Sequence, residues 1–340
     1  MIRITRTVLP AMDNPYAVGY LPLGGQLWGI CASGSRGISL AFPVGAPDQA
    51  QVQALEPANW GAQMFCPADG DSYFAIQGFL PEFQCENSCL VRIRKEAVCW
   101  RVEQCFSMPF LHKIAVLKNG GHRFLFCATL SGPKAFKEDW SQPGAVWVSP
   151  IPEDPVDGTW SFSRLLYPMT KNHGFCRGTL KGKEALFFSA TEGVFAVSAS
   201  ETTAAGWDVS KLMKSEIGDL SVMDDGALIA AVDGFHGNRF SIYRCVDGRY
   251  HSILSTLLTW GHTAWIGRVG NVPVAVAGEL EGDARILFFA DCGHGFELIH
   301  MEPQTGPFSV CPRQVSTTVL ELFCPARAAG HPLIYRLELL

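Results

Sequence analysis

Three histidines and one aspartate recur at the start of short apolar runs that are far apart in the chain. His112, His173, Asp219 and His262 open four such runs. Neutral imidazoles and a carboxylate are ligands that suit zinc, manganese, iron or nickel, and histidine is also the side chain whose proton moves near neutral pH. If these residues meet in the folded chain, they could bind a divalent metal or serve as an acid and base pair. Both interpretations are open from the sequence.

Other apolar runs open with a cation or an aromatic residue. Arg313, or Lys113 inside one of the runs, could hold a developing oxyanion. Tyr16 and Trp60 offer flat apolar faces of the kind on which sugar rings stack. With histidines that take and return a proton, such a site would eliminate water or an alcohol from a sugar derivative. The candidate catalytic residues are therefore His112, His173, His262 and Arg313.

These openers can meet only if the chain is a repeat array, and their spacing has that form. The seven residues that open the runs, which we call openers and take as equivalent, are Tyr16, Trp60, His112, His173, Asp219, His262 and Arg313. They are separated by 44, 52, 61, 46, 43 and 51 residues. In most units a Gly-containing turn follows the opener and precedes a second, more apolar run, which is a hairpin pattern. A period of about 40 to 50 residues with three or four short strands is typical of a β-propeller blade. The sequence predicts an all-β, seven-bladed β-propeller.

We expect a single domain over residues 1–340, with one blade for each opener. The last unit supplies only three strands, so the alternating residues 2–9 are expected to pair with it, complete the seventh blade and close the ring. The segment from Gly132 to Trp140 reads as an insertion between strands. The expected blades are approximately 15–57, 58–108, 109–169, 170–214, 215–258, 259–308, and 309–340 plus 1–10.

In a propeller the first strand of each blade lines the central channel, so the openers converge at one mouth. Loops between the second and third strands share that face, and they carry Gln77, Lys134, Glu192, Asp233, His236, Glu279 and Glu281. A concave site with convergent polar groups is the default binding-site hypothesis. The candidate substrate-binding residues are Tyr16, Trp60, Lys113, Asp233, His236 and Glu279. The candidate metal ligands are His112, His173, Asp219 and His262.

Composition narrows the class of protein. A net charge of −5 and a pI near 6.0 give no basic footprint for nucleic acid. The N-terminus has no signal-peptide pattern, and no apolar run is long enough for a membrane span. The twelve cysteines lie mostly inside apolar runs, which fits buried thiols in a reducing cytoplasm. We expect a cytoplasmic protein with a small-molecule or oligosaccharide ligand and no nucleotide cofactor; the sequence leaves the oligomeric state open.

Three alternatives compete with a histidine-based enzyme. Gly261-His262 is the dipeptide with which WD-type propellers hydrogen-bond their own backbone, although the matching Trp-Asp occurs once, at Trp207-Asp208. The histidines would then be structural. A non-catalytic propeller would bind a ligand or a protein on an exposed apolar patch, for example at the Gly132 to Trp140 insertion. Glycoside hydrolysis would pair Asp219 with Glu192 or Glu279.

The openings at His112, His173 and His262 give the chain a resemblance to a known group of enzymes. It resembles the seven-bladed propeller lyases and dehydratases that act on polysaccharides or keto-sugars. Some of these carry His, Tyr and Arg at the channel mouth and hold a divalent metal there. The resemblance covers all seven units as architecture, and the chain lacks the Asp-rich calcium loops of some such propellers. It implies a carbon–oxygen lyase or related carbohydrate-active enzyme, with Mn, Zn, Fe, Ni or Ca as the candidate metal.

Overall fold

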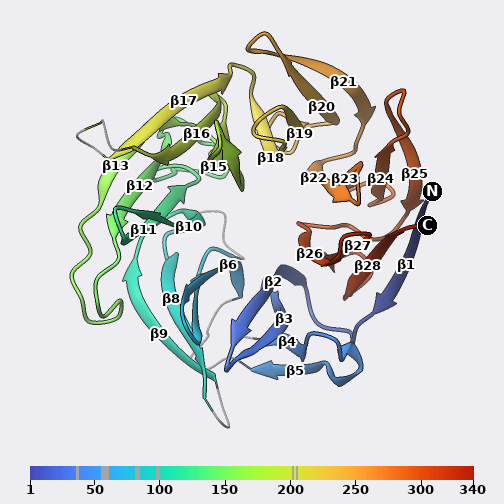
Figure 1. The fold of residues 1–340 in the computed structure, drawn as a ribbon. Helices are drawn as coiled ribbons and strands as arrows, with labels where there is room; N and C mark the ends of the chain where they lie inside the picture. The colour runs from blue at the N-terminus through green and yellow to red at the C-terminus, as the bar shows by residue number, and fades with distance from the viewer. Residues whose placement is uncertain (36–37, 55–60, 81–84, 97–99, 201–202, 204–205) are drawn as a thin grey trace. The chain divides into compact units, whose positions relative to one another are not determined.

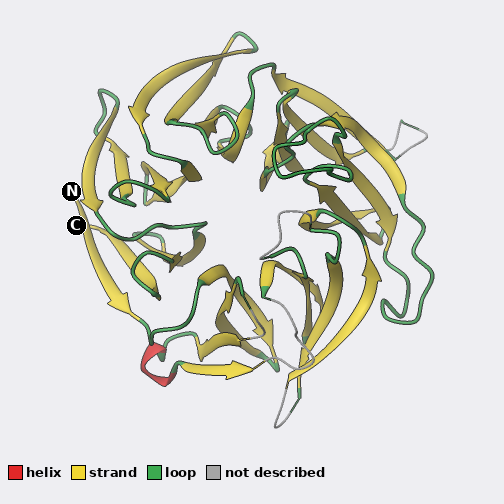
Figure 2. Cartoon of the chain, turned by 180° about the vertical axis from the view of Figure 1, so that it is seen from behind, coloured by secondary structure: helices red, strands yellow, loops and turns green. Residues whose placement is uncertain are grey.

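The described residues form seven four-stranded antiparallel sheets (Figure 1). The computed structural model describes residues 1–35, 38–54, 61–80, 85–96, 100–200, 203 and 206–340. Figure 2 shows strands through most of the described chain, with one turn of 3-10 helix at Pro47–Gln49. The described part contains no helix that could cross a membrane. The predicted all-β, seven-bladed propeller is confirmed.

By internal packing the chain divides into two compact units, which we call the three-sheet unit and the four-sheet unit. The three-sheet unit contains Val8–Thr170 and Gly330–Pro332, and the four-sheet unit contains Met1–Thr7, Lys171–Ala329 and Leu333–Leu340. The expectation of a single domain stays a prediction.

The three-sheet unit holds the first three sheets, each a meander whose strands pair in chain order. Its first strands, β2, β6 and β10, are neighbours. The strands are β2 Pro15–Leu23, β3 Gln26–Ser33, β4 Ile38–Pro43 and β5 Gln51–Ala54; β6 Ala62–Asp69, β7 Ser72–Gln77, β8 Cys89–Lys95 and β9 Trp100–Ser107; β10 Leu111–Asn119, β11 His122–Thr129, β12 Gly144–Pro150 and β13 Ser163–Met169. The predicted insertion lies between β11 and β12, as expected.

The four-sheet unit holds the remaining sheets, and its first strands β14, β18 and β22 are also neighbours. The strands are β14 Gly174–Leu180, β15 Lys183–Ala190, β16 Gly193–Ala199 and β17 Trp207–Met213; β18 Ile217–Met223, β19 Leu228–Asp233, β20 Arg239–Val246 and β21 Arg249–Leu257; β22 Gly261–Val269, β23 Val272–Glu279, β24 Ile286–Asp291 and β25 Phe296–Glu302; β26 Cys311–Ser316, β27 Val319–Ala326, β28 His331–Leu339 and β1 Ile2–Val8.

The seventh sheet joins the two ends of the described chain. Its strand order is β1-β28-β27-β26, so the N-terminal strand is the edge strand beside the C-terminal one (Figure 1). Ile2 and Ile4 of β1 are half-buried against the apolar cluster shared by the sixth and seventh sheets. The predicted pairing of the N-terminal strand with the last blade is confirmed.

In the four-sheet unit the core lies between successive sheets, which explains the apolar second strands. In β15, Ala185 and Phe187 face a cluster that also contains Leu220 and Ile229 of the next sheet. Leu186 and Phe188 of the same strand are also buried. A strand that is covered on both faces cannot alternate polar with apolar residues, and it reads as a continuous apolar run.

Candidate functional site

A residue in the left-handed region precedes the first strand in several sheets. In the four-sheet unit, φ is 55° at Lys171, 56° at Trp260 and 57° at Gly306. Each lies two positions before an opener, in the pairs Lys171 and His173, Trp260 and His262, and Gly306 and Phe308. In β22 the register with β23 shifts between Gly261 and Thr263, so His262 is the extra residue of a β-bulge. Bulges re-aim a side chain next to functional sites.

This geometry corrects three of the predicted equivalences. In the seventh sheet the opener position belongs to Phe308, because Arg313 lies inside β26 and is paired with Glu321 in the register. In the fifth sheet the bulge falls at Gly218, one residue before Asp219. In the second sheet it falls at Gln63, while Trp60 lies outside the described residues.

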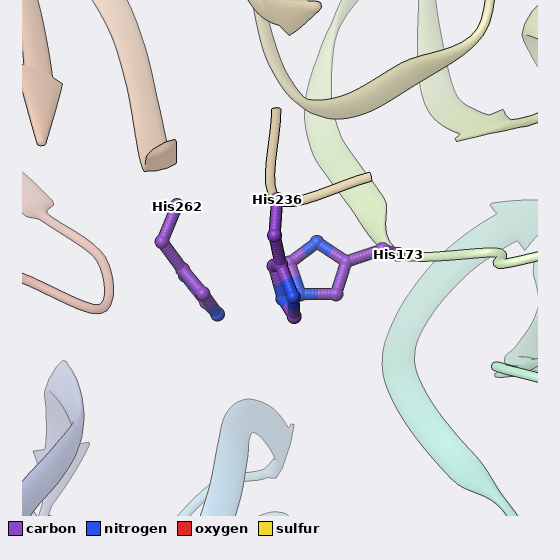
Figure 3. Close-up of side chains that lie close together, drawn as sticks. All are labelled: His173, His236 and His262. Atoms are coloured by element: carbon purple, nitrogen blue, oxygen red, sulfur yellow. The ribbon is translucent and has the colours of Figure 1, made fainter. Parts of the chain in front are cut away.

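Three imidazoles meet in the four-sheet unit (Figure 3). His173 precedes β14, His236 lies in the loop between β19 and β20, and His262 lies in β22. One nitrogen from each ring lies within 4.8 Å of the others. The ring centroids are 4.8 Å apart for His173 and His262, 5.0 Å for His173 and His236, and 5.1 Å for His236 and His262. We call these three residues the histidine cluster.

Two of the rings are fixed by the backbone of the next sheet. His173 Nδ1 lies 2.7 Å from the carbonyl oxygen of Gly218, and His262 Nδ1 lies 2.9 Å from that of Phe308. A carbonyl oxygen only accepts hydrogen bonds, so Nδ1 carries the proton in both rings. In the neutral imidazole Nε2 then holds the lone pair. The partners, Gly218 and Phe308, are themselves the opener positions of the following sheets.

His236 is held differently, by a tight glycine-flanked loop. Its φ is 49°, the N–H of Gly237 donates to the carbonyl of Gly234, and the N–H of Gly261 donates to the carbonyl of Gly237. The left-handed conformation is uncommon for a residue with a side chain and marks a position worth functional scrutiny. Burial lowers the pKa of His236 to about 4, so its ring is neutral near pH 7.

Aromatic rings surround the cluster. Phe235 stacks on His236 with centroids 4.0 Å apart, Trp260 lies 4.3 Å from His236, and Phe308 meets His262 edge-on at 5.0 Å. Trp260 is 37% exposed, whereas His173 and His262 are only 3% and 5% exposed. The side chains of His173 and His262 are therefore shielded from water, whereas part of the Trp260 ring is open to solvent.

Two cations lie at the edge of these aromatic walls. Lys171 Nζ lies 5.9 Å from the Phe235 ring and 3.5 Å from a carboxylate oxygen of Glu216. The Arg327 guanidinium lies 5.1 Å from the Phe308 ring, and no carboxylate of the described residues is within salt-bridge distance of it. Arg327 can therefore offer its donors to an anion that approaches the Phe308 side of the cluster.

The donor set fits a transition-metal ion. Metal-binding histidines usually donate the other ring N–H to a backbone carbonyl or a carboxylate, which is the arrangement of His173 and His262. Nitrogen ligands at about 2.0–2.1 Å from a tetrahedral zinc ion lie roughly 3.4 Å apart. The nitrogens of the cluster lie within 4.8 Å of one another, so rings at that separation must move closer by about 1.4 Å to reach this spacing.

The other predicted residues of the four-sheet unit have structural partners. Asp219 Oδ2 accepts the N–H of Ala264 at 3.0 Å, and Asp233 accepts the hydroxyls of Ser241 and Tyr243. These bonds link neighbouring strands or sheets. Arg313 forms an ion pair with Glu321 across β26 and β27. Asp219 is not a member of the described histidine cluster.

Glu279 is fully buried and forms a close ion pair with Arg285, with Nε to Oε1 at 2.6 Å. The same carboxylate accepts the N–H of Thr259 at 2.7 Å. A buried carboxylate satisfied in this way fixes the loop before β24. Its predicted role in substrate binding therefore competes with a structural one.

Tyr16, His112 and Lys113 belong to the three-sheet unit. Tyr16 and His112 are buried, and the His112 ring lies 4.9 Å from that of Phe79. Asn14 and Phe110 have φ of 44° and 62°, so Tyr16 and His112 follow the same two-residue rule as His173 and His262. The catalytic, metal-binding or substrate-binding roles predicted for the three residues stay predictions.

The insertion between β11 and β12 does not form the apolar patch that a docking surface would need. Phe136 is exposed, but Trp140 is half-buried under Lys134, whose Nζ lies 3.1 Å from the ring centroid. The Lys134 ammonium also donates to the carbonyl of Lys137. A single exposed ring is ordinary for a protein surface.

The sequence pattern missed four residues of this site and gave His236 a different role. Phe235, Trp260, Phe308 and Arg327 surround the cluster, and none of them was a candidate. His236 was a candidate for substrate binding but lies among the possible metal ligands. Gly234 and Gly237 on either side of His236, and Gly306-Pro307 before Phe308, are the local signals that could have found them.

No protein-family model matches the sequence, and no characterised protein matches it by sequence comparison. Solved structures do match. Virginiamycin B lyase from Staphylococcus aureus aligns over 100% of both chains with a TM-score of 0.62 and 11% identity. The likeness is one of fold.

Two further matches differ in what their names describe. The Cps50 (Swd1) β-propeller domain of Myceliophteria thermophila aligns over 99% of this chain and 100% of that one, with a TM-score of 0.61 and 11% identity. A putative 6-phosphogluconolactonase from Bacteroides fragilis aligns over 90% and 89%, with a TM-score of 0.51 and 12% identity. The neighbours are thus varied propellers, and only some carry an enzyme's name. The resemblance to sugar lyases is loose.

Proposed function

We propose that the chain is a metal-assisted lyase or dehydratase that acts on an anionic carbohydrate derivative at the histidine cluster. The observation that carries this proposal is the meeting of three imidazole nitrogens within 4.8 Å, two of them on rings whose Nδ1 is bonded to a carbonyl. The third ring, His236, is neutral near pH 7 because burial lowers its pKa to about 4. Neutral imidazoles are suited to metal binding and to accepting a proton.

The surrounding residues suit a flat, anionic substrate. Trp260 presents an exposed ring face against which a sugar ring can stack. The Arg327 guanidinium beside Phe308 can pair with a substrate carboxylate or phosphate. A bound divalent metal supplies a Lewis acid for a carbonyl or hydroxyl oxygen.

In such an elimination a base takes the proton from the carbon next to the acid or carbonyl group. The electron pair of that C–H bond forms the C=C bond, and the C–O bond breaks with its electrons on the leaving oxygen, which is then protonated. A ring of the histidine cluster whose Nε2 lone pair is not engaged by the metal would be the base, because one lone pair cannot bind a metal and accept a proton together. The fold match with a protein named as a lyase is consistent with this class but does not select it over the other propellers.

The proposed metal binding and the structural hydrogen bond can be tested separately, because Nδ1 of each ring bonds a backbone carbonyl and Nε2 is the proposed metal ligand. In His262→Asn and His173→Asn, the amide nitrogen is as many bonds from the backbone as Nδ1, so it can still donate to the carbonyl of Phe308 or Gly218. It cannot replace Nε2. We expect both variants to keep their thermal stability and to lose zinc or manganese affinity by about 100-fold or more, the upper end of losses seen even for outer-shell partners. Isothermal titration calorimetry and elemental analysis of the purified chain measure this.

The matched control is His262→Leu, which removes both nitrogens. It should lose the metal and also about 1–3 kcal/mol of unfolding free energy, because the carbonyl of Phe308 is left without this donor. If the wild-type chain binds no divalent metal, or if the Asn variants bind it as well as the wild type, the metal site is wrong. The wild-type chain should form an ultraviolet-absorbing unsaturated product from candidate uronate substrates. If the Asn variants no longer form this product, the site is connected to the elimination.

A further inference from the structure

The three-sheet unit contains a pocket. The histidine cluster lies in the other unit. The pocket has a volume of about 510 Å³, within the range of roughly 300–1,000 Å³ that small-molecule sites occupy. Its walls come from the connection from β9 to β10, the end of β11 with the base of the insertion that follows it, strand β12, and the edge strand β13 with the residue before it. Its lining includes four aromatic residues, one amide and one cation: Phe110, Trp147, Phe162, Tyr167, Gln142 and Arg164.

Four aromatic residues, Phe110, Trp147, Phe162 and Tyr167, are among the residues that line this pocket. Phe110 is buried, Trp147 and Phe162 are half-buried, and Tyr167 is 53% exposed. Large rings bury much apolar area with little loss of side-chain freedom, so rings that are left partly in water at a concave surface favour a flat apolar ligand.

Arg164 supplies a cation that the protein positions but does not neutralise. Its guanidinium lies 4.3 Å from the Tyr167 ring and 6.0 Å from the ring of Trp147, its cross-strand partner in β12. Within the described ranges, no carboxylate forms an ion pair with it. A guanidinium stacked on rings keeps its in-plane N–H donors for a carboxylate, which it can bind through two parallel hydrogen bonds.

The polar groups of the pocket argue against a sugar. Thr129 Oγ1 accepts the N–H of Ala145 at 3.0 Å, and the Ser131 hydroxyl donates to the carbonyl of Gly132 at 2.8 Å. The remaining neutral polar side-chain groups of the lining are the exposed Gln142 amide, the Tyr167 hydroxyl and the Trp147 indole N–H, which can only donate. A polyol needs several hydrogen-bond partners at once, whereas a carboxylate needs one positioned cation.

We propose that this pocket binds a small aryl carboxylate, with the ring against Trp147, Phe162 and Tyr167 and the carboxylate on Arg164. The site is separate from the proposed elimination and does not depend on it. A ligand of about 13 non-hydrogen atoms at ordinary ligand efficiency should bind with a dissociation constant of roughly 20 µM to 1 mM.

The test uses the full chain and two matched probes, indole-3-acetate and its uncharged amide, indole-3-acetamide. Titration followed by ligand-observed NMR should show the acetate binding at least about 10-fold more tightly than the amide. Arg164→Gln should remove that preference, and Arg164→Lys should keep only part of it, because an ammonium is a point charge without the bidentate fork.

Arg249→Gln is the control for a change of charge, since Arg249 is exposed on β21 of the four-sheet unit. It should bind the acetate as the wild type does. Equal binding of acetate and amide, or unchanged acetate binding in Arg164→Gln, would overturn the proposal. So would the failure of indole-3-acetate, phenylacetate and benzoate to bind at about 5 mM, well above the expected constants. His262→Asn should leave acetate binding intact, which separates this site from the proposed function.

Discussion

The two nitrogens of His173 and His262 have separate duties. Nδ1 ties the start of one sheet to the start of the next through a carbonyl, and Nε2 is the nitrogen that holds the lone pair. A structural histidine and a functional histidine are therefore not exclusive alternatives at these positions. The Gly-His pair at Gly261-His262 indicated a backbone hydrogen bond, and the neighbouring sheet, rather than its own, provides the acceptor.

His236 should make the metal-free protein less stable in mild acid. Its pKa is lowered to about 4 by burial, whereas an unfolded histidine titrates near 6.5. Between these values the unfolded chain binds a proton that the folded chain does not, so stability is full above about pH 6.5 and falls as the pH drops toward about 4. Urea unfolding in the presence of a chelator measures the free energy of unfolding at pH 7 and at pH 4.5. The decrease between these two pH values should be larger by roughly 1–3 kcal/mol in the wild type than in His236→Gln. Equal losses in both proteins would contradict the assignment.

At the scale of elements, the site depends on how each first strand begins. The left-handed Trp260 and the bulge at His262 re-aim that side chain, the left-handed Lys171 precedes His173 in the same way, and the loop between β19 and β20 adds His236. With the corrected openers Tyr16, Gln63, His112, His173, Gly218, His262 and Phe308, the spacings become 47, 49, 61, 45, 44 and 46 residues. They are more regular than the predicted ones, and the long one is explained by the insertion.

The sequence could predict the repeat, the strands and the location of two cluster members. The hairpin pattern and its glycine turns are local signals, and the apolar second strands follow from burial on both faces. It could not predict that the fifth and seventh openers are Gly218 and Phe308, because these positions contribute a carbonyl and not a polar side chain. The nearby polar residues Asp219 and Arg313 were therefore predicted as openers in their place.

The loop that holds His236 tolerates no side chain at Gly237. A Cβ there would lie 1.7 Å from the carbonyl oxygen of Asp233, so the backbone must move. We expect Gly237→Ala to displace His236 and to weaken metal binding by about as much as His236→Ala, at least roughly 10-fold. Asn238 in the same loop is exposed, so Asn238→Ala should have little effect on metal affinity. Titration calorimetry compares the three variants, and normal affinity in Gly237→Ala would show that the loop does not position the ligand.

At the scale of the molecule, the sheets of the four-sheet unit share apolar clusters with their neighbours in that unit, and the seventh sheet takes one strand from each end of the described chain. The aromatic-lined pocket and the histidine cluster lie in different compact units. The two proposed binding sites can therefore be tested independently of one another.

The N-terminal strand should contribute to global stability. Ile2 and Ile4 pack on the cluster that contains Leu333 and Leu337, and Arg6 forms an ion pair with Glu302. Because both isoleucines are half-buried, the double variant Ile2→Ala/Ile4→Ala should cost about 2–4 kcal/mol, the low end for such truncations. Chemical unfolding measures it. Val8→Ala, at an exposed position of the same strand, is the control and should change stability by less than about 0.5 kcal/mol.

The pairing of β1 with β28 also sets a timetable for biosynthesis. More than 300 residues separate the two strands, and at about 5–20 residues per second a ribosome needs roughly 15 to 65 seconds to deliver the second after the first. During that interval the nascent β1 has no partner in its own sheet, while the other sheets pair strands that leave the ribosome in succession. An exposed strand edge can recruit a foreign one. The first eight residues are therefore the segment that a cell must protect for longest.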